Sequence, residues 1–199
     1  MCAANVAPFE VRDGRCGKCR GRRPSIGGTV RVGPYVDLLG QLIRSYKYGG
    51  RDQFGALLGG WLAQRIVNAP WLERVEAIVS VPTHWRHRLG RPLHAAGALA
   101  SVVAREQSLP HVPILRRVRA GPHQVGLSYE QRAKNVRGAF ALRRGVSLRD
   151  ARLLLIDDVK TTGATLNECA KILRRGGAAE VYAAVVVAVG EGRPANRRT

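Results

Sequence analysis

The stretch LLLIDDVKTTGAT, from Leu153 to Thr165, decides the fold class of this chain of 199 residues. Its first four residues form an unbroken apolar run, which is typical of a strand buried on both faces of a parallel sheet. Two adjacent carboxylates follow, and then a loop of threonine and glycine that opens a helix. Ligands of α/β proteins bind in the crevice at the carboxyl ends of such strands. The stretch therefore predicts a ligand site between a strand and a helix.

The loop of this stretch has the chemistry of a phosphate site. Backbone N–H groups and hydroxyls meet at a helix N-terminus, where unpaired donors and the helix dipole favour an anion, and Gly163 lets the backbone come close to it. Asp157 and Asp158 suit vicinal hydroxyls instead, because carboxylates accept hydrogen bonds. The alternative is that Asp157 only ends the strand and Thr165 only caps the helix. The order of all the parts favours a ribose 5-phosphate site.

Apolar periodicity continues this interpretation on both sides. Helical spacing predicts helices over residues 38–46, 54–66, 93–105 and 166–175. Apolar runs predict strands over residues 75–81, 139–142, 152–156 and 181–189. Such alternation indicates an α/β fold, a parallel sheet flanked by helices. We expect a small irregular Cys-containing segment at residues 1–30, the α/β domain at 31–190 and a basic tail at 191–199.

The charge is strongly positive. Thirty-three Lys and Arg against 14 Asp and Glu give a net charge of +19, and nearly all the basic residues are arginine. One interpretation is a polyanion partner such as nucleic acid or a phosphorylated small molecule. The other is arginine encoded freely by a GC-rich genome, and both stay open. The segment at residues 116–137 is basic and has no clear period. It is either a mobile loop that closes over the site, a solvated loop, or a nucleic-acid track that includes Arg116, Arg117, Arg119, Arg132 and Arg137.

Targeting signals are not evident in the sequence. No apolar run approaches the ~20 residues of a membrane helix. The first residues lack the basic-then-apolar pattern of a signal peptide. We therefore expect a cytoplasmic protein.

The stretch at residues 153–165 is similar to the signature of the type I phosphoribosyltransferases. This resemblance implies that Asp157 and Asp158 bind the ribose hydroxyls of a phosphoribosyl pyrophosphate-type ligand, which enters with Mg²⁺. It implies that the 5-phosphate is held by Thr161, Thr162, Gly163, Ala164 and Thr165.

Further motifs resemble one family, ComF (competence protein FC and its relatives). They are the strand at residues 78–82 with the arginine-rich loop after it, the Tyr46-Lys47-Tyr48 triplet, a Cys-x-x-Cys near the start and a scattered pattern from Gln124 to Phe140. The resemblance implies a pyrophosphate loop made by Pro82, Thr83, His84, Arg86, Arg88 and Arg91. It implies a flexible loop with Gln124, Arg132 and Asn135. The chain departs from the family at residues 91–95, where the usual Asn and Gln are missing.

The ComF resemblance also implies a small zinc-binding segment and a role beside single-stranded DNA. The candidate zinc ligands are Cys2, Cys16 and Cys19, and the alternative is free thiols, because a closed Zn²⁺ site needs four ligands. Family members handle single-stranded DNA in natural transformation, which places the competence machinery at the membrane among the expected partners. A second hypothesis is an active phosphoribosyltransferase that transfers ribose 5-phosphate to a nitrogen base. The sequence assigns no catalytic residue.

Overall fold

The computed structural model describes most of the chain in four segments, residues 25–48, 53–82, 95–119 and 135–189. Before them, only the backbone of two short strands is described. These are β1 (Val11–Arg12) and β2 (Arg15–Cys16), which pair antiparallel.

A four-stranded parallel sheet forms the centre of the molecule. Its strands are β3 (Thr29–Pro34), β4 (Ala77–Ser80), β7 (Arg152–Lys160) and β8 (Glu180–Ala188). They stand in the order β3-β8-β7-β4, and each pair of neighbours is parallel. The predicted parallel sheet is thereby confirmed. The two long strands occupy the centre because their apolar residues are buried on both sides.

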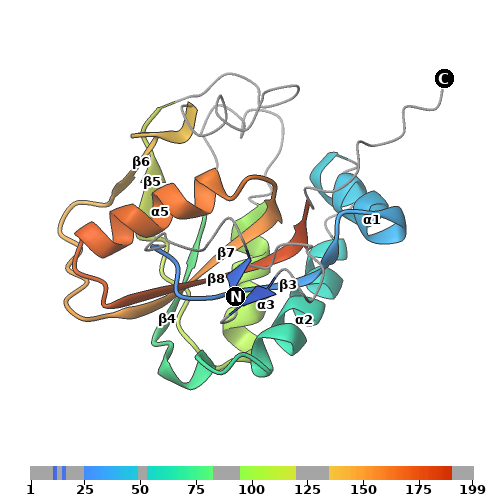
Figure 1. Ribbon diagram of the computed structural model, residues 1–199, viewed down its shortest axis with the longest axis horizontal. Helices are drawn as coiled ribbons and strands as arrows, with labels where there is room; N and C mark the ends of the chain where they lie inside the picture. Colours follow the sequence, from blue (N-terminus) through green and yellow to red (C-terminus); the bar gives the residue numbers. More distant parts are fainter. Residues whose placement is uncertain are drawn as a thin grey trace.

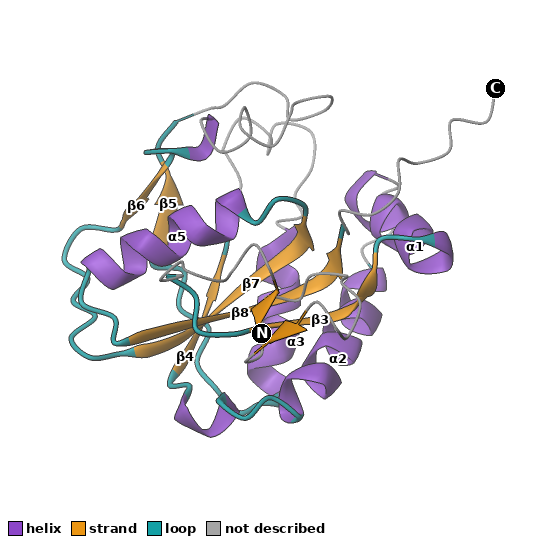
Figure 2. Ribbon diagram, in the orientation of Figure 1, coloured by secondary structure: helices purple, strands orange, loops and turns teal. Residues whose placement is uncertain are grey.

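Helices cover both faces of the sheet (Figures 1 and 2). One face carries α1 (Asp37–Tyr48), α2 (Phe54–Val67) and α3 (Ala95–Glu106), and the other carries α5 (Ala164–Arg175). A short turn, η3 (Leu72–Arg74), precedes β4. Beside α5 lies a small antiparallel pair, β5 (Leu115–Arg117) with β6 (Phe140–Leu142). No described helix has the length and apolar character that crossing a membrane requires.

The side chains of β7 and β8 alternate between two cores. Leu154 and Ile156 pack with α2 and α3, whereas Leu153 and Leu155 pack with α5. This alternation follows from the period of two along a strand. The helices on both faces therefore hold the sheet through two separate apolar cores.

The structure corrects two expectations about strands. β7 was predicted to end at Ile156, but it continues to Lys160, and Asp157 still pairs with Val185 of β8. β3, which is the first strand of the four-stranded sheet along the chain, was not predicted. It lies at the sheet edge, its residues are mostly half-buried, and it ends in Gly33 and Pro34, so no apolar run marks it.

Candidate functional site

The loop between β7 and α5 turns at Gly163, a position that favours glycine. Gly163 has φ +76, a left-handed conformation, and it stands as the N-cap of α5 without a side chain that could accept a hydrogen bond from the helix. The Thr162 hydroxyl accepts a hydrogen bond from the Ala164 N–H at 3.2 Å. A Cβ on Gly163 would lie 3.3 Å from Cε of Lys160. The loop therefore presents a helix N-terminus directly, with a lysine stem packed against it.

The two aspartates leave the sheet on opposite faces. Asp158 is buried, with 6% of its surface exposed, and points to the face that carries α1. Asp157 is half-buried and lies near Cys169 of α5, whose thiol pKa its charge helps to raise. The Asp158 N–H donates to Oδ1 of Asp157 at 2.9 Å. Carboxylates thus flank the edge of β7 from both sides, next to the phosphate loop.

Lys47, in the last turn of α1, completes this edge. Its Nζ lies 2.9 Å from Oδ2 of Asp158. Burial alone would lower the pKa of Lys47, but Asp158 and then Asp157 raise it, and the net shift is upward. The lysine is therefore a cation held beside two acids.

The pKa of Asp157 is raised well above its ordinary value, first by burial and then by the charge of Asp158. Lys47 opposes this shift without cancelling it. A carboxyl group whose ionisation is resisted by its surroundings gains from hydrogen-bond donors, such as hydroxyls, that approach it. Asp157 therefore stands at this edge as an acid that hydrogen-bond donors would stabilise.

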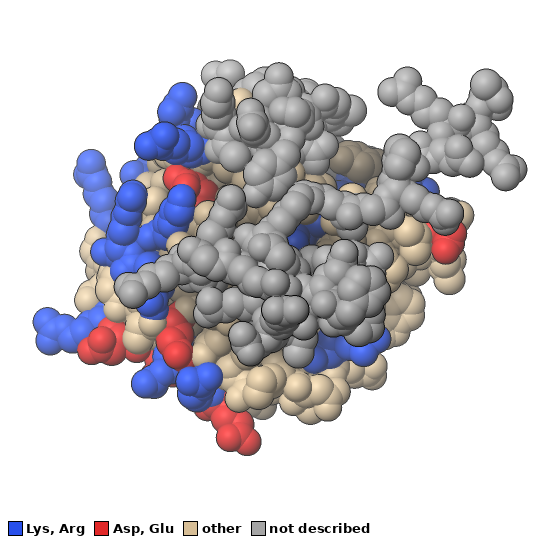
Figure 3. Space-filling model, in the orientation of Figure 1, with Lys and Arg blue, Asp and Glu red and all other residues tan. Residues whose placement is uncertain are grey.

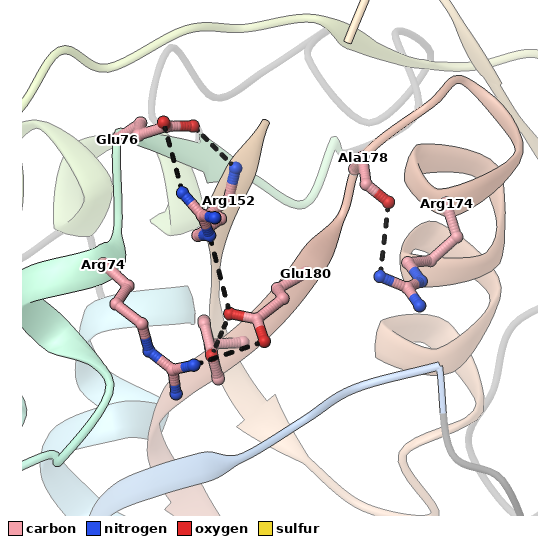
Figure 4. Close-up of polar contacts among 7 residues, drawn as sticks. Arg74, Glu76, Arg152, Arg174, Ala178 and Glu180 are labelled. Atoms are coloured by element: carbon pink, nitrogen blue, oxygen red, sulfur yellow. Dashed lines mark hydrogen bonds and ion pairs between the residues drawn. The ribbon is translucent and has the colours of Figure 1, made fainter. Parts of the chain in front are cut away.

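The opposite, amino edge of the sheet carries a different charge pattern (Figure 4). Glu180 accepts from Arg74 at 3.4 Å and lies 3.9 Å from Nε of Arg152. Arg152 also lies 3.8 Å from Glu76, which accepts the Arg152 N–H at 2.8 Å. Two glutamates meet two arginines on the surface, so the negative and positive charges of these four side chains balance.

Most other predicted site residues lie outside the described part of the chain. This holds for the pyrophosphate-loop residues Thr83, His84, Arg86, Arg88 and Arg91, for Gln124 and Arg132 of the flexible loop, and for Cys2 and Cys19. Pro82 is described and follows β4 directly, at the same edge of the sheet as the phosphate loop. Asn135 is half-buried beside the buried Val136. Cys16 is described only as backbone of β2.

The structure adds two residues that the sequence did not single out as ligands, Lys47 and Lys160. Only five of the 33 basic residues are lysine, and two of these five stand at this site. The rarity of lysine in this chain and the position of Lys47 between two tyrosines are the sequence features that could have pointed to it as a site residue. Among the described residues no group of three His, Cys, Asp or Glu could hold a metal ion.

Comparison with known proteins places this geometry in a family. Residues 92–199 match the phosphoribosyl transferase domain. The chain is 33% identical over 173 residues to competence protein F of Haemophilus influenzae, covering 83% of this chain and 75% of that protein. It is 31% identical over 170 residues to the DNA utilization protein YhgH of Escherichia coli, covering 83% and 74%. Superposition on adenine phosphoribosyltransferase from Leishmania donovani gives a TM-score of 0.48 at 14% identity, covering 89% and 93%.

The parallel sheet, the loop at residues 161–163 and the domain match define a protein of the phosphoribosyltransferase class. Within that class, more than 30% identity over most of both chains is decisive. The chain belongs to the ComF family, with competence protein F and YhgH as relatives.

Proposed function

We propose that this protein binds a phosphoribosyl pyrophosphate-type ligand with Mg²⁺ at the carboxyl edge of its sheet. The observation that carries the proposal is that β7 bears two adjacent carboxylates near its carboxyl end and leads directly into a glycine-capped helix N-terminus. The 5-phosphate would take the N–H groups and hydroxyls of Thr161, Thr162, Gly163, Ala164 and Thr165. The ribose hydroxyls would donate to Asp157 and Asp158.

Calorimetric titration tests this proposal with three probes. Phosphoribosyl pyrophosphate with Mg²⁺ is expected to bind best, ribose 5-phosphate more weakly, and pyrophosphate alone weakest, because only the first occupies every part of the site. Ribose without phosphate serves as the control and is expected not to bind measurably. Equal affinity for ribose 5-phosphate and pyrophosphate would contradict the role of the aspartates.

A second part of the proposal is a role in handling single-stranded DNA during natural transformation, which the ComF resemblance implies; the relatives are named competence protein F and DNA utilization protein YhgH. It is supported by a basic surface that runs from the C-terminal half of α5 to β5, β6 and the turns beside them (Figure 3). The exposed members are Arg116, Arg119, Arg137, Arg143, Arg144, Arg149, Lys171 and Arg175. Strands from distant parts of the sequence bring these charges together. A phosphodiester backbone is the polyanion that suits such an extended surface.

Arg117, expected on the same track, belongs to the fold instead. It is half-buried, its guanidinium lies 5.5 Å from the centre of the Phe140 ring, and its Nε donates to the Arg119 carbonyl. Burial also lowers the pKa of its guanidinium. Replacement of Arg117 would therefore disturb the β5–β6 pair, and it is excluded from the test below.

The DNA role is tested by the salt dependence of binding to a labelled single-stranded oligonucleotide, measured by fluorescence anisotropy. A track of several arginines is expected to give a log–log slope of roughly −2 to −4. Arg143→Ala with Arg144→Ala is expected to flatten that slope by about 1.4, since each neutralised phosphate contributes about 0.7. The matched control removes two exposed arginines on the other face, Arg65 and Arg105. Equal slopes in the two double variants would exclude this surface.

An active phosphoribosyltransferase is the second candidate, favoured by the intact phosphate loop. Its chemistry would consist mainly of positioning and of neutralising the pyrophosphate. The test is pyrophosphate release from phosphoribosyl pyrophosphate in the presence of each common nucleobase. Base-dependent release would establish the enzyme, and tight ligand binding without release would favour the binding role alone.

Two further expectations from the ComF resemblance also stay proposals. They are a zinc ion at Cys2, Cys16 and Cys19, and a place near the membrane-bound competence machinery.

A further inference from the structure

Lys47 reaches the ligand edge from a part of the chain far from the phosphate loop. Its ammonium lies 2.9 Å from Oδ2 of Asp158, and the two side chains are 28% and 8% exposed. α1 belongs to the beginning of the domain, whereas β7 lies more than 100 residues later. The pair therefore joins two segments that only the tertiary structure brings together.

The position of Lys47 is set by the fold rather than by the ion pair alone. Its neighbour Tyr46 is 2% exposed, and its hydroxyl donates to the carbonyl of Ala95, the first residue of α3, at 2.9 Å. A Cβ on Gly55 of α2 would lie only 3.2 Å from the Tyr46 ring, so α2 packs closely on the same tyrosine. The last turn of α1 is thus anchored to two helices, and it holds the ammonium in place before any ligand arrives.

The carboxyl edge has an electrostatic conflict that this lysine resolves. Asp157 and Asp158 are adjacent acids, and the ligand proposed above is itself a polyanion. Like charges in a partly buried site repel strongly, because the effective dielectric is low. We propose that Lys47 is a positioning residue of the sugar-phosphate site, which fixes the Asp158 carboxylate and offsets one of the two negative charges that would otherwise repel the phosphorylated ligand. This inference rests on the function proposed above.

A lysine suits this task better than the arginines that dominate the chain. An ammonium is a compact point charge, and here it contacts one carboxylate oxygen, Oδ2. A guanidinium tends to engage both oxygens of a carboxylate in a fork, which would compete with a ribose hydroxyl. We therefore expect Lys47→Arg to keep the charge but to lose part of the affinity.

The experiment compares wild type, Lys47→Arg and Lys47→Met by calorimetric titration with phosphoribosyl pyrophosphate and Mg²⁺. Methionine keeps the length of the stem and removes the charge. Lys47→Met is expected to bind at least about tenfold more weakly, the effect of one lost charge-assisted contact. Lys47→Arg is expected to fall between the two. Affinity of Lys47→Met within about twofold of wild type would overturn the proposal.

Proton linkage separates this electrostatic role from a merely structural one. Titrations in two buffers of different ionisation enthalpy measure the protons taken up on binding. Lys47→Met is expected to take up more protons than wild type, because a proton on the carboxylate pair replaces the missing positive charge. Unchanged proton uptake with reduced affinity would show a structural role instead and overturn the proposal. The groups that face this cluster are Asp157 and Asp158 of β7, Tyr48 of α1, Glu168 and Cys169 of α5, and Arg117 of β5.

A double variant keeps the test decisive if Lys47→Met folds poorly. Lys47→Met with Asp158→Asn removes both charges and leaves no unpaired ion in the interior. If Lys47 acts through Asp158, the double variant is expected to bind no more weakly than Asp158→Asn alone. A further loss of tenfold or more would mean that Lys47 acts elsewhere. If the wild-type protein does not bind the ligand, the proposed function itself is refuted. If the wild-type protein binds and Lys47→Met binds equally well, only the role of the lysine is refuted.

Discussion

The two edges of the parallel sheet use charge in opposite ways. At the amino edge Arg74 and Arg152 meet Glu76 and Glu180 in exposed pairs of 3.4–3.9 Å. At the carboxyl edge the pair of Lys47 and Asp158 is shorter, at 2.9 Å, and largely buried. A second acid, Asp157, stands beside it without an equivalent partner among the described residues.

This difference supports the carboxyl edge as the place for the proposed ligand. Exposed pairs in water contribute little to stability, so the amino edge gains mainly solubility and order. An adjacent pair of acids in a half-buried site is costly for folding. Such a cost is retained where a ligand uses it, which is the pattern of functional sites. The predictions below test that contrast, from the largest expected effect to the smallest.

Breaking the buried pair is expected to have the largest effect on stability. Asp158→Ala leaves the Lys47 ammonium without its carboxylate and should lower the free energy of unfolding by about 3 kcal/mol. This value is at the low end of the range for a broken buried ion pair, because the Lys47 side chain keeps some exposure to water. The matched change at the amino edge, Arg74→Ala, should cost less than about 1 kcal/mol. Urea unfolding followed by circular dichroism measures both. Equal losses would remove the contrast between the edges.

Asp157→Asn is expected to separate binding from stability. Loss of a charge-assisted hydrogen bond to the ribose should weaken ligand binding by about 1.5–3 kcal/mol. The folded-state pKa of Asp157 lies above the ordinary 3.8, so its favourable contribution is present below that pH and is lost as the pH rises. Asparagine stays neutral, so the variant should be more stable than wild type at pH 7, with a gap that grows from about pH 4 upward.

Thermal unfolding across that pH range and calorimetric titration test Asp157→Asn together. The control is Asp150→Asn, an exposed aspartate with φ 57, a backbone conformation that asparagine tolerates. It should change neither ligand binding nor the pH profile. A variant at Asp157 that is less stable than wild type at neutral pH would contradict the burial argument.

The phosphate loop can be tested with a matched pair of glycines. Gly163 and Gly145 have nearly the same φ, +76 and +77, but a Cβ on Gly145 would meet nothing within 4 Å. Each change to valine should cost about 1–3 kcal/mol of backbone strain. Only Gly163→Val should also abolish binding of ribose 5-phosphate, because its side chain would block the approach of the anion. Native binding by Gly163→Val would show that this loop does not wrap the phosphate.

The smallest expected effect concerns His111, beside the carboxyl end of β4. Its Nε2 lies 3.1 Å from the Ser80 hydroxyl and its Nδ1 lies 3.2 Å from that of Ser101. Burial lowers the pKa of His111, so its contribution to stability is complete above about pH 6.5 and falls as the pH drops below that value. The free energy of unfolding falls by less than about 1.4 kcal/mol per pH unit, which is the steepest slope that the titration of one group produces. His111→Gln should flatten the profile between pH 5 and 7, whereas an unchanged profile would assign the acid sensitivity to other groups.

The sequence predicted the parts of the fold that carry a strong local signal. Leu153–Ile156 is an unbroken apolar run, and the helix after it ends at Gly176, as its period indicated. The signal fails where burial is partial. β3 is an edge strand whose residues are mostly half-buried, and the last four residues of β7 are held by pairing with β8 rather than by an apolar pattern.

The sequence by itself determined the parallel α/β class and the succession of apolar strand, two acids, threonine and glycine loop and helix, because each depends on residues adjacent in the chain. It also determined the total charge. Only the tertiary structure decided that Lys47 meets Asp158 and that Arg117 packs on Phe140. Such contacts join segments far apart in sequence, and they form only when apolar burial brings the helices onto the sheet.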